Sequence, residues 1–302
     1  MSFFIGGRMP LETSVFGQVE TDLKNRKYNS ALRKLSLLSV RHSKNIQYLI
    51  CLSQALKALG DQDALIKTLK ELNRQQADIE TEIEIMALLY KNAQINEALD
   101  IGLSLQDKNL TATQKTNLYC TLMRIYIEEN DFDGVKEMVE QSEEIVNQND
   151  FMLWAHGLAC LSNNDRNQAL SRFRKAVELN PKNDQVWVSL ALVHQQMGDE
   201  ELGLANLEKA LDCNPLNNAA VKLYSQWAIK KSDKAQKALD SVRFYLTEHE
   251  FDEEISVCHV QLLCQMKHFN TAQSEIQKLI LTHPRNINYP EMKKNLEQNL
   301  NM

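Results

Sequence analysis

The chain is poor in the residues that interrupt regular structure. It holds nine Gly and five Pro in 302 residues, whereas usual frequencies of about 7% and 5% would give roughly twenty and fifteen. Few tight turns and few long loops are therefore expected, which argues against a fold built from β-hairpins. Leu, Ala, Glu, Gln, Lys and Asn are abundant instead, and most of these residues favour helix.

Long apolar runs are missing as well. No run approaches the roughly 18 residues that a membrane-spanning helix requires, so no membrane insertion is expected. The short apolar cluster Phe3-Phe4-Ile5 lacks the basic start and the length of a secretory signal. The six cysteines show no tight spacing, and we therefore predict a cytoplasmic protein with reduced thiols.

The net charge of −6 is unevenly distributed. Residues 1–45 carry eight Lys and Arg against three Asp and Glu, a difference of +5, and residues 79–150 carry five against fifteen, a difference of −10. An acidic total argues against a broad phosphate-binding surface, so no nucleic-acid partner is expected. The basic end and the acidic middle are expected to influence which partners bind.

The sequence repeats with a period of 34 residues between positions 151 and 217. The stretch LWAHGLACLSNNDRNQALSRFRKAVELNPKND is followed at this spacing by WVSLALVHQQMGDEELGLANLEKALDCNPLNN. The small residues Gly157 and Ala169 let two helices approach closely, and Phe173 fills the space beside them. Pro181 ends the second helix, because proline disfavours helix at the residue before it. Weaker copies of the pattern continue on both sides.

The pattern resembles the tetratricopeptide repeat family, whose unit is a helix–turn–helix of 34 residues. The resemblance implies an all-α fold, a right-handed superhelical solenoid of about eight antiparallel helix hairpins whose first helices line a concave groove. Repeats are expected to begin near residues 12, 46, 79, 116, 150, 184, 218 and 253, within a solenoid spanning residues 12–286. Residues 1–11 are expected to be a flexible segment, and residues 287–302 a helix that caps the last hairpin.

The expected partner site is an apolar strip in the groove. Trp154, Leu158 and Leu161 lie one residue beyond the buried positions of their helix, about 100° around its axis, and in the family that strip faces the groove. Val188 and Leu192 repeat the pattern 34 residues later. Soluble proteins rarely expose a contiguous apolar patch without a use, so we predict that a protein or peptide, most simply an amphipathic helix, binds there. Burial of the strip by neighbouring repeats is the alternative.

A second candidate surface is acidic. Six carboxylates lie within a stretch of thirteen residues and are predicted to meet a basic partner, with a merely solvated face as the equal alternative. These residues are Glu128, Glu129, Asp131, Asp133, Glu137 and Glu140.

Part of this stretch also has the spacing of a calcium-binding loop. Acidic side chains alternate at Glu129, Asp131 and Asp133, Gly134 follows, and Glu140 closes the segment. The first position is Glu rather than Asp, however, and the repeat register places the segment at the turn between two helices. We therefore interpret it as a turn.

Other patterns that could support chemistry are equally weak. Cys258, Cys264 and His268 suggest a metal site, but on a helix Cys258 points about 240° away from Cys264. No glycine-rich phosphate loop, GxSxG, HExxH or CxxC motif occurs. We therefore predict no metal, no cofactor and no enzymatic activity.

The resemblance predicts a non-catalytic scaffold or adaptor that holds a partner segment in its groove. Two alternatives remain: a chaperone that shields an aggregation-prone or secreted subunit, and a peptide-sensing regulator. The sequence leaves the partner's identity and the oligomeric state open.

Overall fold

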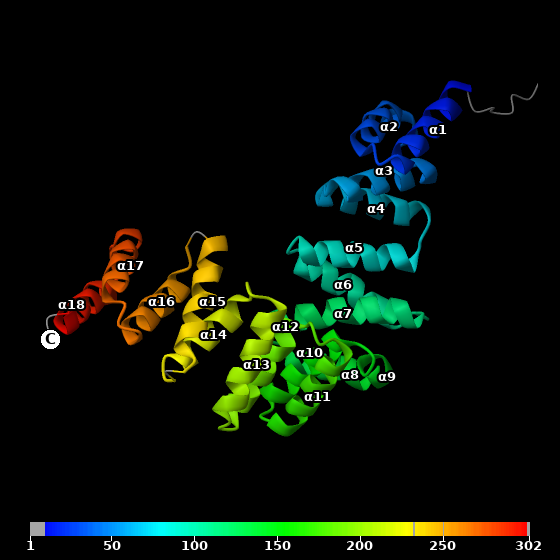
Figure 1. Ribbon diagram of the computed structural model, residues 1–302. Helices are drawn as coiled ribbons and strands as arrows, with labels where there is room; N and C mark the ends of the chain where they lie inside the picture. Colours follow the sequence, from blue (N-terminus) through cyan, green and yellow to red (C-terminus); the bar gives the residue numbers. More distant parts are fainter. Residues whose placement is uncertain (1–9, 232, 250, 301–302) are drawn as a thin grey trace, which may run out of the picture. The chain divides into compact units, whose positions relative to one another are not determined.

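The protein is helical throughout its described length. The computed structural model describes residues 10–231, 233–249 and 251–300, and no strand occurs in these ranges. The expected all-α fold is therefore confirmed (Figure 1). Residues 1–9 of the expected flexible segment lie outside the described residues, and residue 10 already begins the first helix.

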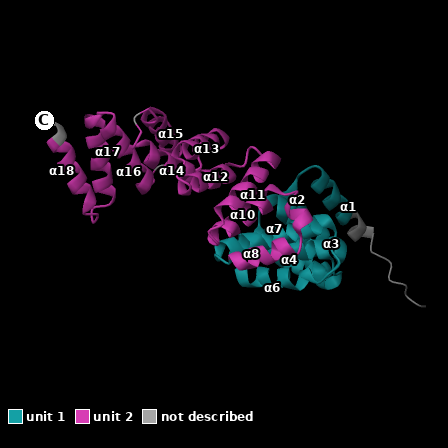
Figure 2. Ribbon diagram, turned by 90° about the horizontal axis from the view of Figure 1, so that it is seen from below, with its two compact units in different colours: residues 1–131 teal, residues 132–302 magenta. Residues whose placement is uncertain are grey.

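The chain divides into two compact units, residues 1–131 and residues 132–302 (Figure 2). The helices described in the first unit are α1 (Pro10–Lys24), α2 (Tyr28–His42), α3 (Ile46–Leu59), α4 (Gln62–Gln75), α5 (Ile79–Lys91), α6 (Ile95–Gln106) and α7 (Ala112–Glu128). Those described in the second unit are α8 (Phe132–Glu140), α9 (Glu143–Val146), α10 (Asp150–Ser162), α11 (Arg166–Leu179), α12 (Asp184–Gln196), α13 (Glu200–Cys213), α14 (Asn218–Ala228), α15 (Ala235–Glu248), α16 (Glu253–Gln265), α17 (Phe269–Thr282) and α18 (Asn288–Leu300).

Within each unit, consecutive helices pack as antiparallel pairs. In unit 1 the pairs are α1 with α2, α3 with α4, and α5 with α6, and in unit 2 they include α10 with α11, α12 with α13, and α16 with α17. Here the first helix of a pair means α1, α3, α5, α10, α12 or α16, and the second helix means its partner. Helix α18 packs against α17 at the end of unit 2.

The turn between the first and second helices has one recurring geometry. A single residue takes the left-handed conformation just after the first helix, and the next N–H donates to a carbonyl five residues back, as in Asp165 N–H to Cys160 O at 3.0 Å. This bond satisfies a carbonyl that the helix end would leave unpaired. The left-handed residues are Arg26, Gly60, Ala93, Asn130, Asn164, Gly198 and Lys267.

Small residues set the spacing of helices within and between the hairpins. A Cβ atom added to Gly157 would lie 2.3 Å from the ring of Phe173, a side chain with no exposed surface. In unit 1, a Cβ added to Gly102 would lie 2.6 Å from Leu122. Both positions therefore require glycine because a neighbouring core side chain occupies the space of the Cβ atom.

Polar clamps join successive repeats in unit 2. Asp150 Oδ2 accepts hydrogen bonds from the side-chain amides of Asn180 and Asn183 at 2.9 and 2.8 Å. Thirty-four residues later, Asp184 accepts two such bonds at 2.8 Å, from Asn214 and Asn217. In each clamp, the asparagine that ends one hairpin and the asparagine that caps the next helix are thus both bonded to the start of the preceding first helix.

Candidate functional site

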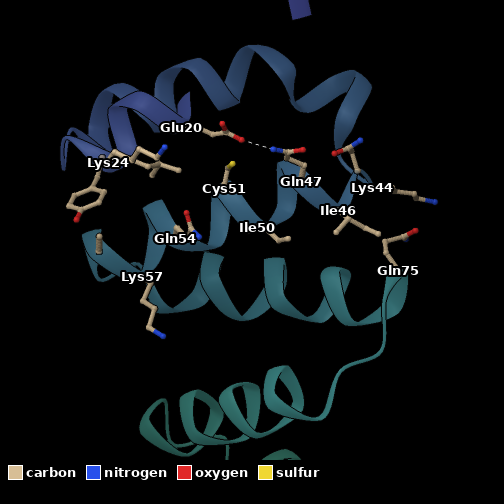
Figure 3. A pocket seen from close by; sticks show the side chains of 14 residues that line it. Glu20, Lys24, Lys44, Ile46, Gln47, Ile50, Cys51, Gln54, Lys57 and Gln75 are labelled. Carbon is tan, nitrogen blue, oxygen red and sulfur yellow. Dashed lines mark hydrogen bonds between the residues drawn. The ribbon is translucent and has the colours of Figure 1, made fainter. Parts of the chain in front are cut away.

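Unit 1 holds a groove of about 1280 Å³ along the first helices α1 and α3. We call it the α1–α3 groove, and Figure 3 shows its lining. Its walls are Glu20, Leu23, Lys24, Tyr28, Lys44, Asn45, Ile46, Gln47, Ile50, Cys51, Gln54, Lys57, Ala58 and Gln75.

Helix α3 provides the floor of this groove. Asn45 caps the helix by accepting a hydrogen bond from Tyr48 N–H at 3.1 Å, which fixes the first turn. Leu49 is buried on the inner side of α3, whereas Ile46 and Ile50 are 38% and 41% exposed. Two isoleucines one turn apart on the solvent side therefore give the groove an apolar floor.

Polar groups surround that floor. Gln47 Nε2 donates to Glu20 Oε1 at 2.5 Å and so joins α3 to α1. Cys51 is 4% exposed, and its burial, followed by the charge of Glu20, raises the pKa of its thiol. Cys51 is therefore a protonated wall residue rather than a nucleophile.

Three lysines and one glutamate line the groove, a balance of +2. Lys24 and Lys57 lie at one end, Lys44 at the other (Figure 3). Lys57 forms an ion pair with Glu84 of α5 at 2.7 Å. In the described part of the chain, Lys24 and Lys44 have no carboxylate within ion-pair distance, although Lys44 helps to lower the pKa of Glu71 after the hydrogen bonds from Gln75 and Arg74.

The apolar strip predicted in unit 2 is less exposed than expected. Val188 is only 8% exposed and belongs to the core, so its assignment to an open groove surface is corrected. Trp154, Leu158, Leu161 and Leu192 are half-buried. The reason is the close approach of the next first helix, which brings the neighbouring repeat over part of the strip.

Trp154 itself joins two repeats. Its Nε1–H donates to Ser189 Oγ on α12 at 2.8 Å, and its ring lies 5.6 Å from that of Phe151. Ser189 is 6% exposed and donates in turn to Gln185 O at 3.0 Å. Trp154 therefore has a structural role, whatever else its exposed part contacts.

The six acidic residues are all exposed, but they belong to different units. Glu128, Glu129 and Asp131 lie at the end of unit 1, and the other three lie in unit 2. Several of them have local partners: Glu128 accepts a hydrogen bond from Tyr90, Asp133 accepts one from Lys136 Nζ at 2.8 Å, and Glu137 accepts one from Gln141 Nε2 at 3.4 Å. Their proposed contact with a basic partner stays a prediction.

The segment with calcium-loop spacing is a helix–helix turn. Asn130 is its left-handed residue, and Asp131 N–H donates to Tyr126 O at 2.7 Å. Among the described residues no group of three or more His, Cys, Asp or Glu is placed to hold a metal ion. Cys258 is 2% exposed, and burial raises the pKa of its thiol to about 11.

Sequence reasoning missed the α1–α3 groove because it sought the site in the strongest repeats. Two signals were present at the N-terminal end. Ile46 and Ile50 are apolar residues outside the buried positions of α3. Lys24 and Lys44 belong to the basic excess of residues 1–45.

Stacked antiparallel helix pairs with a groove along the first helices define the α-solenoid class of interaction modules. The tetratricopeptide repeat family matches residues 152–183 and 184–215. The chain therefore contains at least two tetratricopeptide repeats, and the structures described next share its fold.

Several known proteins are similar to this chain. Cellulose synthase operon protein C of Escherichia coli is 31% identical over 109 residues, which are 34% of this chain and only 9% of that protein. PilF of Pseudomonas aeruginosa is 15% identical, with a TM-score of 0.58 over 72% of this chain and 97% of its own. A tetratricopeptide repeat protein of Parabacteroides merdae is 15% identical, with a TM-score of 0.53 over 83% and 98%. At such low identity the structural matches show the fold alone.

Within the described ranges, no helix combines the length and the apolar character that crossing a bilayer requires.

Proposed function

We propose that the chain is a non-catalytic scaffold or adaptor that holds a segment of a partner protein in the α1–α3 groove. Proteins of this family are generally interaction modules without catalytic activity. The observation that carries the proposal is the pair of exposed isoleucines, Ile46 and Ile50, on the floor of a groove of about 1280 Å³. Apolar floors flanked by a few polar groups are typical of peptide-binding surfaces.

The test is a comparison of tagged variants as bait in a lysate of the native cell. The groove variant is Ile46→Ser with Ile50→Ser, and the matched control is Leu37→Ser, which removes an 82% exposed leucine on the second helix α2. We expect a stoichiometric partner to be retained by the wild type and the control and lost by the groove variant. Circular dichroism melts check that all three proteins stay folded.

Other outcomes would identify the alternatives. Retention of many unfolded proteins would favour a chaperone for aggregation-prone or secreted subunits, and a small peptide that changes a second binding event would favour a sensor. A partner that the groove variant still retains would contradict the α1–α3 site. A cytoplasmic location stays a prediction, supported by the six cysteines, all of which are free thiols.

The half-buried strip of Trp154, Leu158, Leu161 and Leu192 is a second proposed contact for the same partner or another. Leu158→Ser is its cleanest probe, because Trp154 also bonds to Ser189. Loss of partner binding with an unchanged melting temperature would support the strip, and unchanged binding would remove it.

The likeness to cellulose synthase operon protein C covers 9% of that protein. This match therefore concerns the repeats alone, and no partner or pathway of this chain is inferred from it.

A further inference from the structure

The α1–α3 groove has a charge pattern that limits which segments it can hold. Its cations lie at its two ends, with Lys24 and Lys57 at one and Lys44 at the other, and its isoleucines lie between them (Figure 3). A ligand that complements this surface has an apolar centre and anionic ends.

The length of the groove follows from helix geometry. Lys57 lies 11 residues after Ile46, the first residue of α3, which is about 17 Å at 1.5 Å per residue. Lys44 lies in the turn just before α3 and Lys24 at the same end as Lys57, so the cations at the two ends are about 20 Å apart. An extended peptide covers the same distance in about six residues at 3.3 Å each. An α-helix would need about thirteen residues and a trough about 10 Å wide.

The polar lining favours the extended form. An extended segment presents free backbone N–H and C=O groups, whereas a helix has paired nearly all of its own. Gln54 stands on the same face of α3 as Ile50 and Lys57, and in the described part of the chain its amide has no hydrogen-bond partner. The carbonyl oxygen of Gln47 is likewise uncommitted, since its amide nitrogen is the atom that bonds to Glu20.

We propose that the α1–α3 groove binds an extended acidic segment of a partner protein, with acidic side chains about six residues apart on either side of apolar ones. The inference rests on the proposed function and names the chemistry of its partner. Lys24 and Lys44 meet the two acidic ends, Ile46 and Ile50 the apolar centre, and Gln54 the backbone.

Single-stranded nucleic acid is a poorer fit to the same lysines. Such strands are held by several aromatic platforms within a strongly positive channel. Tyr28 is the one aromatic side chain in the groove lining, and the whole chain carries a net charge of −6.

The experiment selects peptides without assuming their sequence. A phage-displayed library of random peptides of about sixteen residues, long enough to cover the groove in either conformation, is selected on the full chain at low salt. We expect enrichment of peptides with Asp or Glu about six residues apart around Leu, Ile, Val or Phe. Enrichment of neutral or basic peptides, or a spacing of about thirteen residues, would overturn the proposal.

The selected peptides are then synthesised, and their affinities are measured by fluorescence anisotropy. Lys24→Glu with Lys44→Glu should weaken binding by about tenfold or more, and added salt should weaken it further. The matched control is Lys67→Glu, which reverses an exposed cation on α4 outside the groove and should leave affinity unchanged. Lys24→Gln with Lys44→Gln separates loss of attraction from new repulsion.

The outcomes distinguish this inference from the proposed function. Peptides that depend on Ile46 and Ile50 but not on the two lysines would leave the proposed function standing and remove the acidic partner. If no enriched peptide depends on either pair, both fall. Binding of a random-sequence RNA oligonucleotide that is lost in the Lys24→Glu, Lys44→Glu variant would overturn the inference in favour of nucleic acid.

Discussion

The first helices of the two units differ in how fully they are used for packing. In unit 2, α10 and α12 are bonded through Trp154 and Ser189, and Asp150 and Asp184 each hold two asparagine amides. In unit 1, α1 and α3 share an apolar cluster that includes Val19 and Leu49. On their groove side Gln47 bonds to Glu20, and the two isoleucines of α3 remain exposed.

This difference shows that a strong repeat signal in the sequence marks good packing between repeats and does not by itself mark a binding site. The 34-residue period is clearest where each side chain has a partner in the next repeat, so regularity measures complementarity inside the stack. A site for an outside partner needs surface that the stack has not used. The N-terminal repeats supply it, because Ile46 and Ile50 stay 38% and 41% exposed there.

The largest expected effect tests how tightly unit 2 is packed. Gly157→Ala places a Cβ atom 2.3 Å from the buried ring of Phe173 and should destabilise unit 2 by up to about 3 kcal/mol, as over-packing typically does. The same substitution at Gly17 of α1, where no atom lies within 4 Å, should stabilise its helix by as much as about 1 kcal/mol.

Urea unfolding measures both changes. All three tryptophans, Trp154, Trp187 and Trp227, belong to unit 2, so their fluorescence follows that unit, and circular dichroism follows the whole chain. Equal destabilisation by the two alanines would contradict the difference in packing.

The next effect concerns the response of unit 2 to acid. Burial, and secondarily the charge of Arg172, lowers the pKa of His156 to about 4, against a weaker opposing effect of Glu143. Burial likewise lowers the pKa of His194 and His259. These rings are kept neutral in the fold but bind protons once the chain unfolds.

The sign follows from proton uptake. The stability that neutral His156 contributes is present above pH 6.5 and is lost as the pH falls from about 6.5 to about 4. With allowance for the part of the ring that solvent reaches, His156 should account for about 2 kcal/mol of that loss. Carboxylates with lowered pKa, such as Glu208 at about 2 against a usual 4.5, lose their contribution mainly below about pH 4.5.

Tryptophan fluorescence during urea unfolding at several pH values checks this. His156→Leu should flatten the fall in unit 2 stability between pH 6.5 and 4.5, and its stability at pH 7.5 shows separately what the substitution costs in packing. A variant with the full slope of the wild type would show that His156 is not the group responsible.

The fold could be predicted from the sequence because each structural position recurs in several repeats, so the residue types found there can be compared. Gly157, Phe173 and Pro181 have counterparts one period later, so the hairpin follows without any contact being known. The site could not be predicted in the same way. The phase of Trp154 on its helix was correct, but the extent to which the next repeat covers it depends on the separation of helices, which periodicity does not give.

The division into two units had no signal in the period either. It falls between Asp131 and Phe132, within the turn that follows α7, and this turn has the same left-handed geometry as the others. The second helical segment there is shorter, since α8 ends at Glu140 and α9 follows after a break. The break between α8 and α9 leaves the spacing of the later repeats unchanged, so the period does not reveal it.

The smallest expected effect compares the turns of the two units. Ala93 occupies the left-handed position after α5 with φ of 56°, where Gly60 stands one repeat earlier and Asn164 in unit 2. The Cβ atom of alanine is strained there by about 1–2 kcal/mol, and glycine relieves this while making the unfolded chain more flexible. Ala93→Gly should therefore stabilise unit 1 by about 0.5–1 kcal/mol. Asn164→Gly should change the stability of unit 2 by less, because asparagine tolerates the left-handed conformation. Gly60→Ala should destabilise unit 1 by about as much as Ala93→Gly stabilises it.

Urea unfolding followed by circular dichroism measures the stability of all three variants. Since Gln94 N–H must still donate to Leu89 O at 2.9 Å, a loss of stability in Ala93→Gly would mean that this turn is held by its sequence neighbours rather than limited by its strain.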